Sequence, residues 1–413
     1  MKKYVLGVLI GFMLMVSGCK DGQKEVNIQD MQGGEVTSRK EKITIMHTDA
    51  EVPGFQEFIK QAEKELDLEI RVISCPANAD TRQAKISTIL AAGEASVDIF
   101  SVNDEMVSEF KYKGYLEPLN DKVMTKELLS KYPESYMQNI TMKDGEVYSV
   151  PYFMDIMVFW VNREVTGDRE IQTKEDFLSL LKTEWGHDIY GYGSAWDSTY
   201  VYNELSEFIN LFGGDYYNWD NKNTREALTF LHDMAANGQI PISQMTDQYE
   251  QLEQKFLDGK YASIFMYSGA MDVFERAGVY DKNEIQAVTL PQFEKNITNI
   301  ATWQYVLNKA SEHKEGAVKF LKYAASREGN ISYAECMNRL PARLDIVREE
   351  ELDIPGFDIL QDYVEHVELK ERPFSQNTME DISTIGTLFQ KYIMDEISQD
   401  EFCRKAQAIA DGF

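Results

Sequence analysis

The chain has 413 residues, of which 43% are hydrophobic and 12% aromatic, and its formal net charge is −27. A single hydrophobic core rarely grows beyond about 250–300 residues, so the length predicts two lobes. The composition excludes an intrinsically disordered chain. The negative charge argues against a general binder of nucleic acid or anionic membranes, which needs a basic face. Such a charge is typical of a protein kept soluble by mutual repulsion.

The N-terminal segment is typical of a secretory signal peptide. Two lysines are followed by an uncharged, mostly apolar run over residues 4–16, which is shorter than the ~20 residues needed to span a bilayer. Two small residues then precede Cys19, as in a peptidase cleavage site. The segment resembles a bacterial lipobox. It implies that residues 1–18 are removed and that Cys19 becomes an N-terminus carrying diacylglycerol and palmitate.

Residues 19–42 are polar, rich in Gln, Glu, Lys and Gly, and without apolar periodicity. They are predicted to form a flexible tether between the lipid and the folded part. No second run of ~20 apolar residues follows. We therefore expect a protein anchored to the cell membrane by its lipid alone and facing outward.

The remaining cysteines are far apart in the sequence and odd in number, so they cannot all pair within the chain. We expect them to be small buried hydrophobic residues, with a disulfide as the alternative. They are Cys75, Cys336 and Cys403.

Strands and helices alternate in the first folded stretch. The β-prone runs are residues 43–46, 68–73 and 97–102. Between them, apolar residues recur at helical spacing over residues 53–66, and a second helix is predicted over 81–92. This order predicts an α/β fold with a parallel sheet and right-handed crossovers.

Ligands of such sheets bind beyond the carboxyl ends of the strands. Two predicted turns lie there, at residues 48–51 and 103–105. Their Asp and Asn side chains could also cap the helices that follow, and both roles can hold together. From these turns we expect ligand contacts by Asp49, Glu51, Asn103 and Asp104.

The rest of the chain is predicted to be mostly helical. Helices are expected from Asn223, its N-cap, to Gly238, over residues 247–257, around 317–324, and from 357 onward. Three β-prone runs interrupt them, at 262–266, 285–290 and 303–307.

Several short motifs follow one another in a fixed order from residue 97 to residue 343. They are VDIF at 97–100, GYLEPL at 114–119, GEVYSVPY at 145–152, VNRE at 161–164, GGD at 213–215, FLDGKYA at 256–262, AVKFLK at 317–322 and RLPAR at 339–343. Together they resemble the family 1 extracellular solute-binding proteins. These are the receptor subunits of ABC importers, typified by the maltose-binding protein.

The resemblance implies a two-lobed, type II periplasmic-binding-protein fold that closes on its ligand by hinge bending. Crossings between the lobes are implied near 152–155, 288–291 and 326. The N-lobe would comprise residues 43–152 plus 291–326, and the C-lobe residues 153–290 plus 327–413.

A sugar ligand needs aromatic rings for its apolar C–H face. Its hydroxyl rim needs charged hydrogen-bonding groups. The implied cleft edges offer this mixture through Tyr152, Asp155, Trp196, Asp197, Tyr267, Trp303 and Arg343. We expect the two tryptophans to stack on the sugar, with core packing as the alternative for each.

The function implied is capture of a sugar or oligosaccharide by a monomeric receptor and its delivery to ABC permease subunits. We expect no enzymatic activity, cofactor or metal, because no G-x-S-x-G elbow, Cys–His arrangement or zinc-type histidine spacing occurs. One alternative is a secreted glycoside hydrolase, which requires two carboxylates ~5–9.5 Å apart. The other is the ligand-sensing subunit of a membrane sensor.

Overall fold

The computed structural model describes residues 40–76, 78–141, 145–280 and 284–411, which belong to one compact unit beginning at Lys40. The predicted signal peptide, Cys19 and residues 19–39 of the tether lie outside the described residues. Strand β1 (Glu41–His47) starts within the segment assigned to the tether, so the fold begins two residues earlier than predicted.

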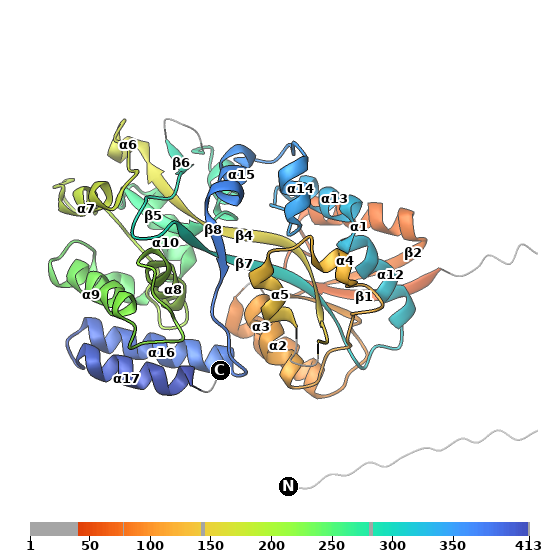
Figure 1. Cartoon of the computed structure of the whole chain (residues 1–413). Coiled ribbons are helices and arrows are strands. Elements are labelled where there is room, and N and C mark those ends of the chain that lie inside the picture. Colours follow the sequence, from red (N-terminus) through yellow and green to blue (C-terminus); the bar gives the residue numbers. More distant parts are fainter. Residues whose placement is uncertain (1–39, 77, 142–144, 281–283, 412–413) are drawn as a thin grey trace, which may run out of the picture. The chain divides into compact units, whose positions relative to one another are not determined.

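The predicted parallel strands form. Strand β1 pairs in parallel with β2 (Leu68–Ser74) and with β3 (Ile99–Asn103). Helices α1 (Pro53–Leu66) and α2 (Ala79–Ala91) connect them (Figure 1). Helix α1 begins at a proline, where a missing N–H has no consequence. Its predicted apolar face is the buried one, formed by Phe55, Phe58, Ile59 and Ala62.

Two long strands join this group to a second group of strands. Strand β7 (Ile297–Leu307) runs antiparallel between β3 and β4 (Ser149–Asn162). Beyond Ile156, β4 pairs instead with β5 (Ser263–Tyr267) and β6 (Ile285–Val288). The strand order is therefore β2-β1-β3-β7-β4-β5, with β6 on β4 and β8 (Glu368–Glu371) on β7. This change of partner within β4 occurs between Ile156 and Met157.

The resemblance also implied crossings near 288–291 and 326. Strand β6 still pairs with β4 as far as Val288, and the chain returns to the first group along β7, beyond residue 291. Ser326 caps α13 (Arg327–Met337), which packs on α1 and on α12 (Lys314–Ala325). Tyr333 of α13 lies edge-on to Phe58 at 5.3 Å. The helices on both sides of Ser326 therefore pack on α1 and on each other.

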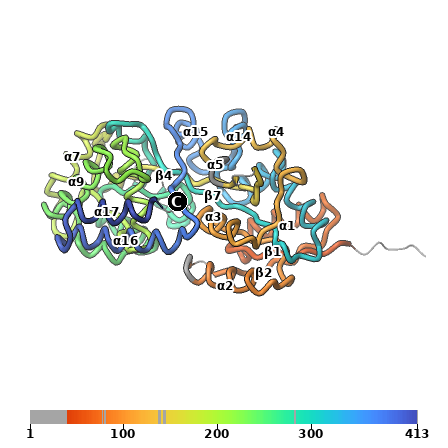
Figure 2. Tube along the Cα trace, turned by 60° about the horizontal axis from the view of Figure 1, so that its bottom comes forward, coloured from red at the N-terminus to blue at the C-terminus, as the bar shows by residue number. Residues whose placement is uncertain are grey.

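The remaining helices cover the two groups of strands (Figures 1 and 2). They are α3 (Asp104–Tyr112), α4 (Lys126–Leu129), α5 (Glu134–Ile140), α6 (Arg163–Thr166), α7 (Lys174–Lys182), α8 (Val201–Leu211), α9 (Lys222–Ala236), the 3-10 turn η1 (Ile242–Thr246), α10 (Tyr249–Leu257), α11 (Ala270–Arg276), α14 (Leu344–Glu349), α15 (Phe357–His366), α16 (Thr378–Ile393) and α17 (Gln399–Ala410). Helix α9 is capped by Asn221, which accepts from two backbone N–H groups, and not by Asn223 as predicted. Helices α9, α16 and α17 pack against one another.

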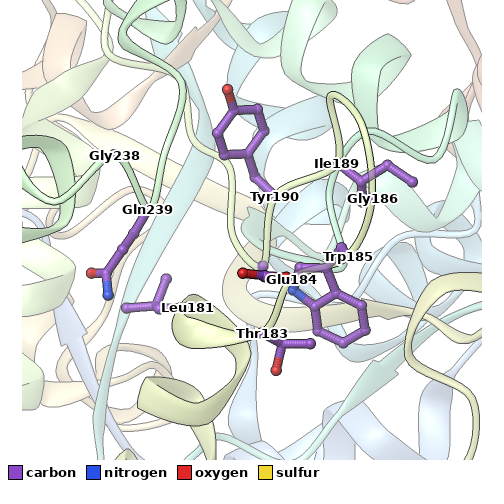
Figure 3. Close-up of a pocket in the computed structure, with 10 residues that line it drawn as sticks. Leu181, Thr183, Glu184, Trp185, Gly186, Ile189, Tyr190, Gly238 and Gln239 are labelled. Atoms are coloured by element: carbon purple, nitrogen blue, oxygen red, sulfur yellow. The ribbon is translucent and has the colours of Figure 1, made fainter.

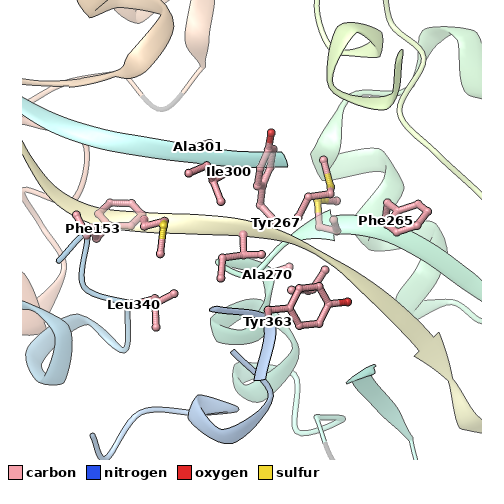
Figure 4. Close-up of a cluster of buried hydrophobic side chains, with 14 of the residues drawn as sticks. Phe153, Phe265, Tyr267, Ala270, Ile300, Ala301, Leu340 and Tyr363 are labelled. Carbon is pink, nitrogen blue, oxygen red and sulfur yellow. The ribbon is translucent and has the colours of Figure 1, made fainter. Parts of the chain in front are cut away.

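Buried side chains from β4, β5 and β7 pack together where these strands meet (Figure 4). Cys75 and Cys403 are buried and Cys336 is partly buried, and each of the three is a free thiol. Among the described residues, no helix has the length and apolarity required to cross a membrane.

Candidate functional site

A cavity of about 490 Å³ lies between the two groups of strands. Its lining comes from the turn after β1, from α2, α3, β4 and β7, and from α8, α10, β5 and α11 of the second group. The segments after α13 and β8 and the first turns of α16 complete it. The cavity is thus built by both groups, at the ends of β1, β3 and β5.

Five of the predicted contact residues line this cavity: Asp49, Asn103, Asp155, Tyr267 and Trp303. Asn103 ends β3 and lies opposite Trp303 in the sheet, so one register fixes both positions. Tyr267 ends β5, opposite Met157 of β4. The turn after β1 and the carboxyl ends of β3 and β5 therefore all contribute to the cavity lining.

Two predicted aromatic contacts belong to the core instead. Trp196 has 0% exposure and packs edge-on against Phe389 at 5.1 Å. Tyr152 stacks on Tyr305 at 4.0 Å, and its hydroxyl pairs with Ser101 at 2.7 Å. Both rings pack against other core residues, and neither lines the cavity.

Four predicted polar contacts also lie outside the cavity lining. Glu51 is exposed to solvent. Asp197 accepts from the backbone and hydroxyl of Thr199, which makes it a local turn residue. The guanidinium of Arg343 is paired with Asp345 at 2.7 Å. The carboxylate of Asp104 is buried beneath the lining and is ion-paired with Arg372.

The ring of Trp303 is partly buried at the cavity wall. The guanidinium of Arg82 lies over it, 4.9 Å from the ring centroid, and the nearly parallel ring of Phe153 lies at 6.1 Å. We expected a sugar to stack on the face of Trp303, but the guanidinium of Arg82 already occupies part of that face. A ligand at this wall meets a guanidinium together with the ring.

Arg372, which follows β8, joins the two groups of strands. It is ion-paired with Asp104 and with Glu105 at 2.7 Å, both in the first turn of α3. It also donates to Tyr202 and Asn203 of α8. Burial disfavours the charge on Glu105, but Arg372 together with hydrogen bonds to Asp104 and Tyr202 holds the pKa of that carboxyl below its usual range.

Acidic groups gather at another part of the cavity. Asp155 accepts from the backbone N–H of Gly269 at 2.8 Å, and burial raises the pKa of both Asp155 and Asp49. Burial, together with the charge of Glu250, raises the pKa of Glu253 to about 7. Such carboxylates accept hydrogen bonds from hydroxyl groups and favour a ligand rich in them.

Sequence reasoning missed the three arginines of the lining, Arg82, Arg339 and Arg372. Arg339 lies in the RLPAR motif, where the resemblance pointed to Arg343, four residues later. The residues next to Arg372 in the sequence give no indication of its role, because its partners on α3 and α8 are distant along the chain.

A smaller cavity of about 340 Å³ lies in the second group, after α7 (Figure 3). Its lining includes Trp185 and Tyr190, with Glu184 as its charged side chain. Because no element of the first group contributes to its lining, domain closure could not enclose a ligand there. The larger cavity is the better candidate.

Solved structures share this fold at low sequence identity. Maltose-bound MalE3 of T. maritima matches with a TM-score of 0.73 and 18% identity, covering 90% of this chain and 99% of that one. An ABC transporter solute-binding protein of Thermotoga lettingae with bound alpha-D-tagatose gives 0.76 and 20%, covering 90% and 100%. Lmo0181 of Listeria monocytogenes, an ABC substrate-binding protein in complex with cycloalternan, gives 0.72 and 19%, covering 90% and 98%.

These matches establish a two-lobed α/β fold of the type II binding-protein kind. The sequence itself matches the family model described as bacterial extracellular solute-binding protein over residues 57–354, which is most of the chain. The chain belongs to the bacterial extracellular solute-binding protein family.

Proposed function

We propose that this protein is the receptor of an ABC importer, which captures a sugar or oligosaccharide in the larger cavity and delivers it to the membrane permease. The observation that carries the proposal is a cavity walled by both groups of strands and lined with aromatic rings, carboxylates and arginines. Structurally similar proteins were solved with maltose, alpha-D-tagatose and cycloalternan. Closing two lobes on a ligand would bury it and change the surface offered to the permease.

The lining supplies both kinds of contact that a sugar needs. Trp303, Phe153 and Tyr267 offer apolar ring surface. Asp49, Asp155 and Glu253 accept hydrogen bonds from hydroxyl groups, while the arginines donate to hydroxyl oxygens. We therefore expect the ligand to lie across the cavity and to touch both groups of strands.

Binding of a carbohydrate is expected to raise the thermal stability of the mature protein. At a concentration 100 times its dissociation constant, a ligand that binds only the folded state adds ~2.7 kcal/mol. A thermal-shift screen of neutral and acidic mono- and oligosaccharides would detect this. If amino acids or peptides stabilise the protein and no carbohydrate does, the sugar assignment is incorrect.

We further propose that the bound sugar is released unchanged. The cavity contains carboxylates, which a glycoside hydrolase also requires. An experiment must therefore distinguish binding without turnover from hydrolysis. Mass analysis of the sugar after prolonged incubation should show no hydrolysis. Cleavage that grows with protein concentration and is lost in the Asp155→Asn variant would establish a hydrolase instead.

We also propose that Cys19 carries the lipid that holds the receptor at the outer face of the cell membrane, where it acts as a monomer. This proposal rests on the lipobox-like segment that ends at Cys19. In the Cys19→Ala variant we expect protein released into the medium or left unprocessed. Fractionation of cells expressing each form measures this, and a variant that is processed and retained like the native protein would contradict lipid anchoring.

A further inference from the structure

Arg339 is fixed in the cavity wall by its backbone. It follows α13, and the next residues add to the edge of β4. The N–H of Met154 donates to the carbonyl of Leu340 at 2.9 Å, and Pro341 lies opposite Phe153. The guanidinium of Arg339 lies 5.5 Å from the centroid of the Phe153 ring. The side chain therefore starts from a rigid edge of the sheet and points across the cavity wall toward the second group of strands.

The second group makes room for this side chain by means of a glycine. A Cβ on Gly269 would lie 2.3 Å from the Nη1 atom of Arg339 and 3.0 Å from the Oδ1 atom of Asp155. Gly269 has φ −57° and ψ −20°, a conformation that alanine adopts without strain. The backbone conformation therefore does not require glycine at position 269. Glycine is required because a side chain there would clash with Arg339.

The part of the chain that the structure describes offers Arg339 no hydrogen-bond partner. The side chain forms no hydrogen bond or ion pair with any residue that the structure describes, and its Nε atom is buried. Acidic groups nevertheless surround it. Burial opposes its charge, but Asp155 and Tyr333, together with Asp49 and Asp272, raise the pKa of Arg339. The N–H donors of Arg339 are thus available to a ligand, while nearby carboxylates already balance its positive charge.

We infer that Arg339 is the specificity-determining contact of this cavity and that it donates to two neighbouring hydroxyl oxygens of an uncharged sugar. This inference rests on the proposed function. A neutral sugar can accept from the guanidinium and donate to Asp49 or Glu253 with the same hydroxyl groups. The carboxylate of a uronate could only accept hydrogen bonds, and the carboxylates around Arg339 would repel it. The ligand class is therefore neutral carbohydrate, and acidic carbohydrates are excluded.

Two substitutions test this contact by different routes. Arg339→Gln removes the charged donors, and we expect a roughly 10- to 150-fold loss of affinity, the range that corresponds to a hydrogen bond to a charged group. Arg339→Lys should restore little, because an ammonium does not form the planar fork that spans two oxygens. Gly269→Ala leaves the arginine in place but displaces it, so it should weaken binding without lowering the melting temperature.

The combined variant decides whether Gly269 acts through Arg339. In the Arg339→Gln background, Gly269→Ala should cause no further loss, because the side chain it displaces is gone. Arg343→Gln is the matched control: this arginine is paired with Asp345 outside the cavity lining, so its loss should leave affinity unchanged. Titrations use the neutral carbohydrate that stabilises the protein most strongly in the screen, for example maltose or cellobiose.

Each outcome bears on one of the two proposals. If no carbohydrate binds, the proposed function fails, and this inference fails with it. If a neutral sugar binds and Arg339→Gln binds it equally well, the inference alone is overturned. Galacturonate or glucuronate oligosaccharides that bind more tightly than their neutral counterparts would likewise overturn the assignment of ligand class. Additive losses in the double variant would show that Gly269 acts independently of Arg339.

Discussion

Replacing Arg372 by methionine is expected to lower the free energy of unfolding by about 3–5 kcal/mol, the usual cost of removing one partner from a buried ion pair. Arg372 is 5% exposed and is paired with two carboxylates that are themselves buried, Asp104 and Glu105. Without the guanidinium, both carboxylates stay in a medium of low polarity and lose the ion-pair partner that they share. Hydrogen bonds to Tyr202 and Asn203 are lost as well.

Arg225 provides a matched control, because it too is paired with two carboxylates, those of Asp220 and Asp400. These carboxylates are largely exposed, at 78% and 88%, so Arg225→Met should cost less than ~1 kcal/mol. Urea unfolding of the three proteins measures the difference. Equal and small losses in both variants would mean that Arg372 does not neutralise the carboxylates of α3.

Substituting each of two tryptophans with alanine should produce opposite effects. Trp196 is fully buried against Phe389, so Trp196→Ala is expected to lower the free energy of unfolding by ~3–5 kcal/mol. Trp303 lines the cavity and holds Arg82 over its ring. Its replacement should mainly weaken binding, by roughly 1–3 kcal/mol, the scale of aromatic stacking on nucleobases.

Melting temperature and sugar affinity, measured on both variants, separate the two roles. Affinity corrected for the fraction of folded protein should be nearly unchanged in Trp196→Ala. A Trp303→Ala protein that melts far below the native protein but binds with native affinity would place Trp303 in the core and leave the cavity wall without its largest ring.

The early part of the fold could be predicted because its signals are local. In α1 the apolar spacing and the starting proline lie within one segment, and the helix forms where expected. The pairing of β7 between β3 and β4 could not be predicted, since it joins residues about 200 and 150 positions apart along the chain and leaves no periodicity in either segment.

The site was predictable to the same extent. Asp49 and Asn103 follow strands whose order was readable, so their place at the carboxyl ends was a consequence of topology. Arg82 and Arg372 come from a helix and a segment whose position depends on long-range packing. Trp196 shows the converse: an aromatic beside an acidic residue after a turn has the composition of a sugar contact, but its environment is that of a core residue.

The central claim is that the larger cavity binds one neutral carbohydrate molecule and releases it intact. Isothermal titration of the purified mature protein with the strongest carbohydrate from the screen, followed by mass analysis of the recovered sugar, tests it most directly. We predict one site per chain, weakened in Trp303→Ala and in Arg339→Gln, and a recovered sugar of unchanged mass. Native affinity in both variants, or a sugar recovered as its hydrolysis products, would contradict the account.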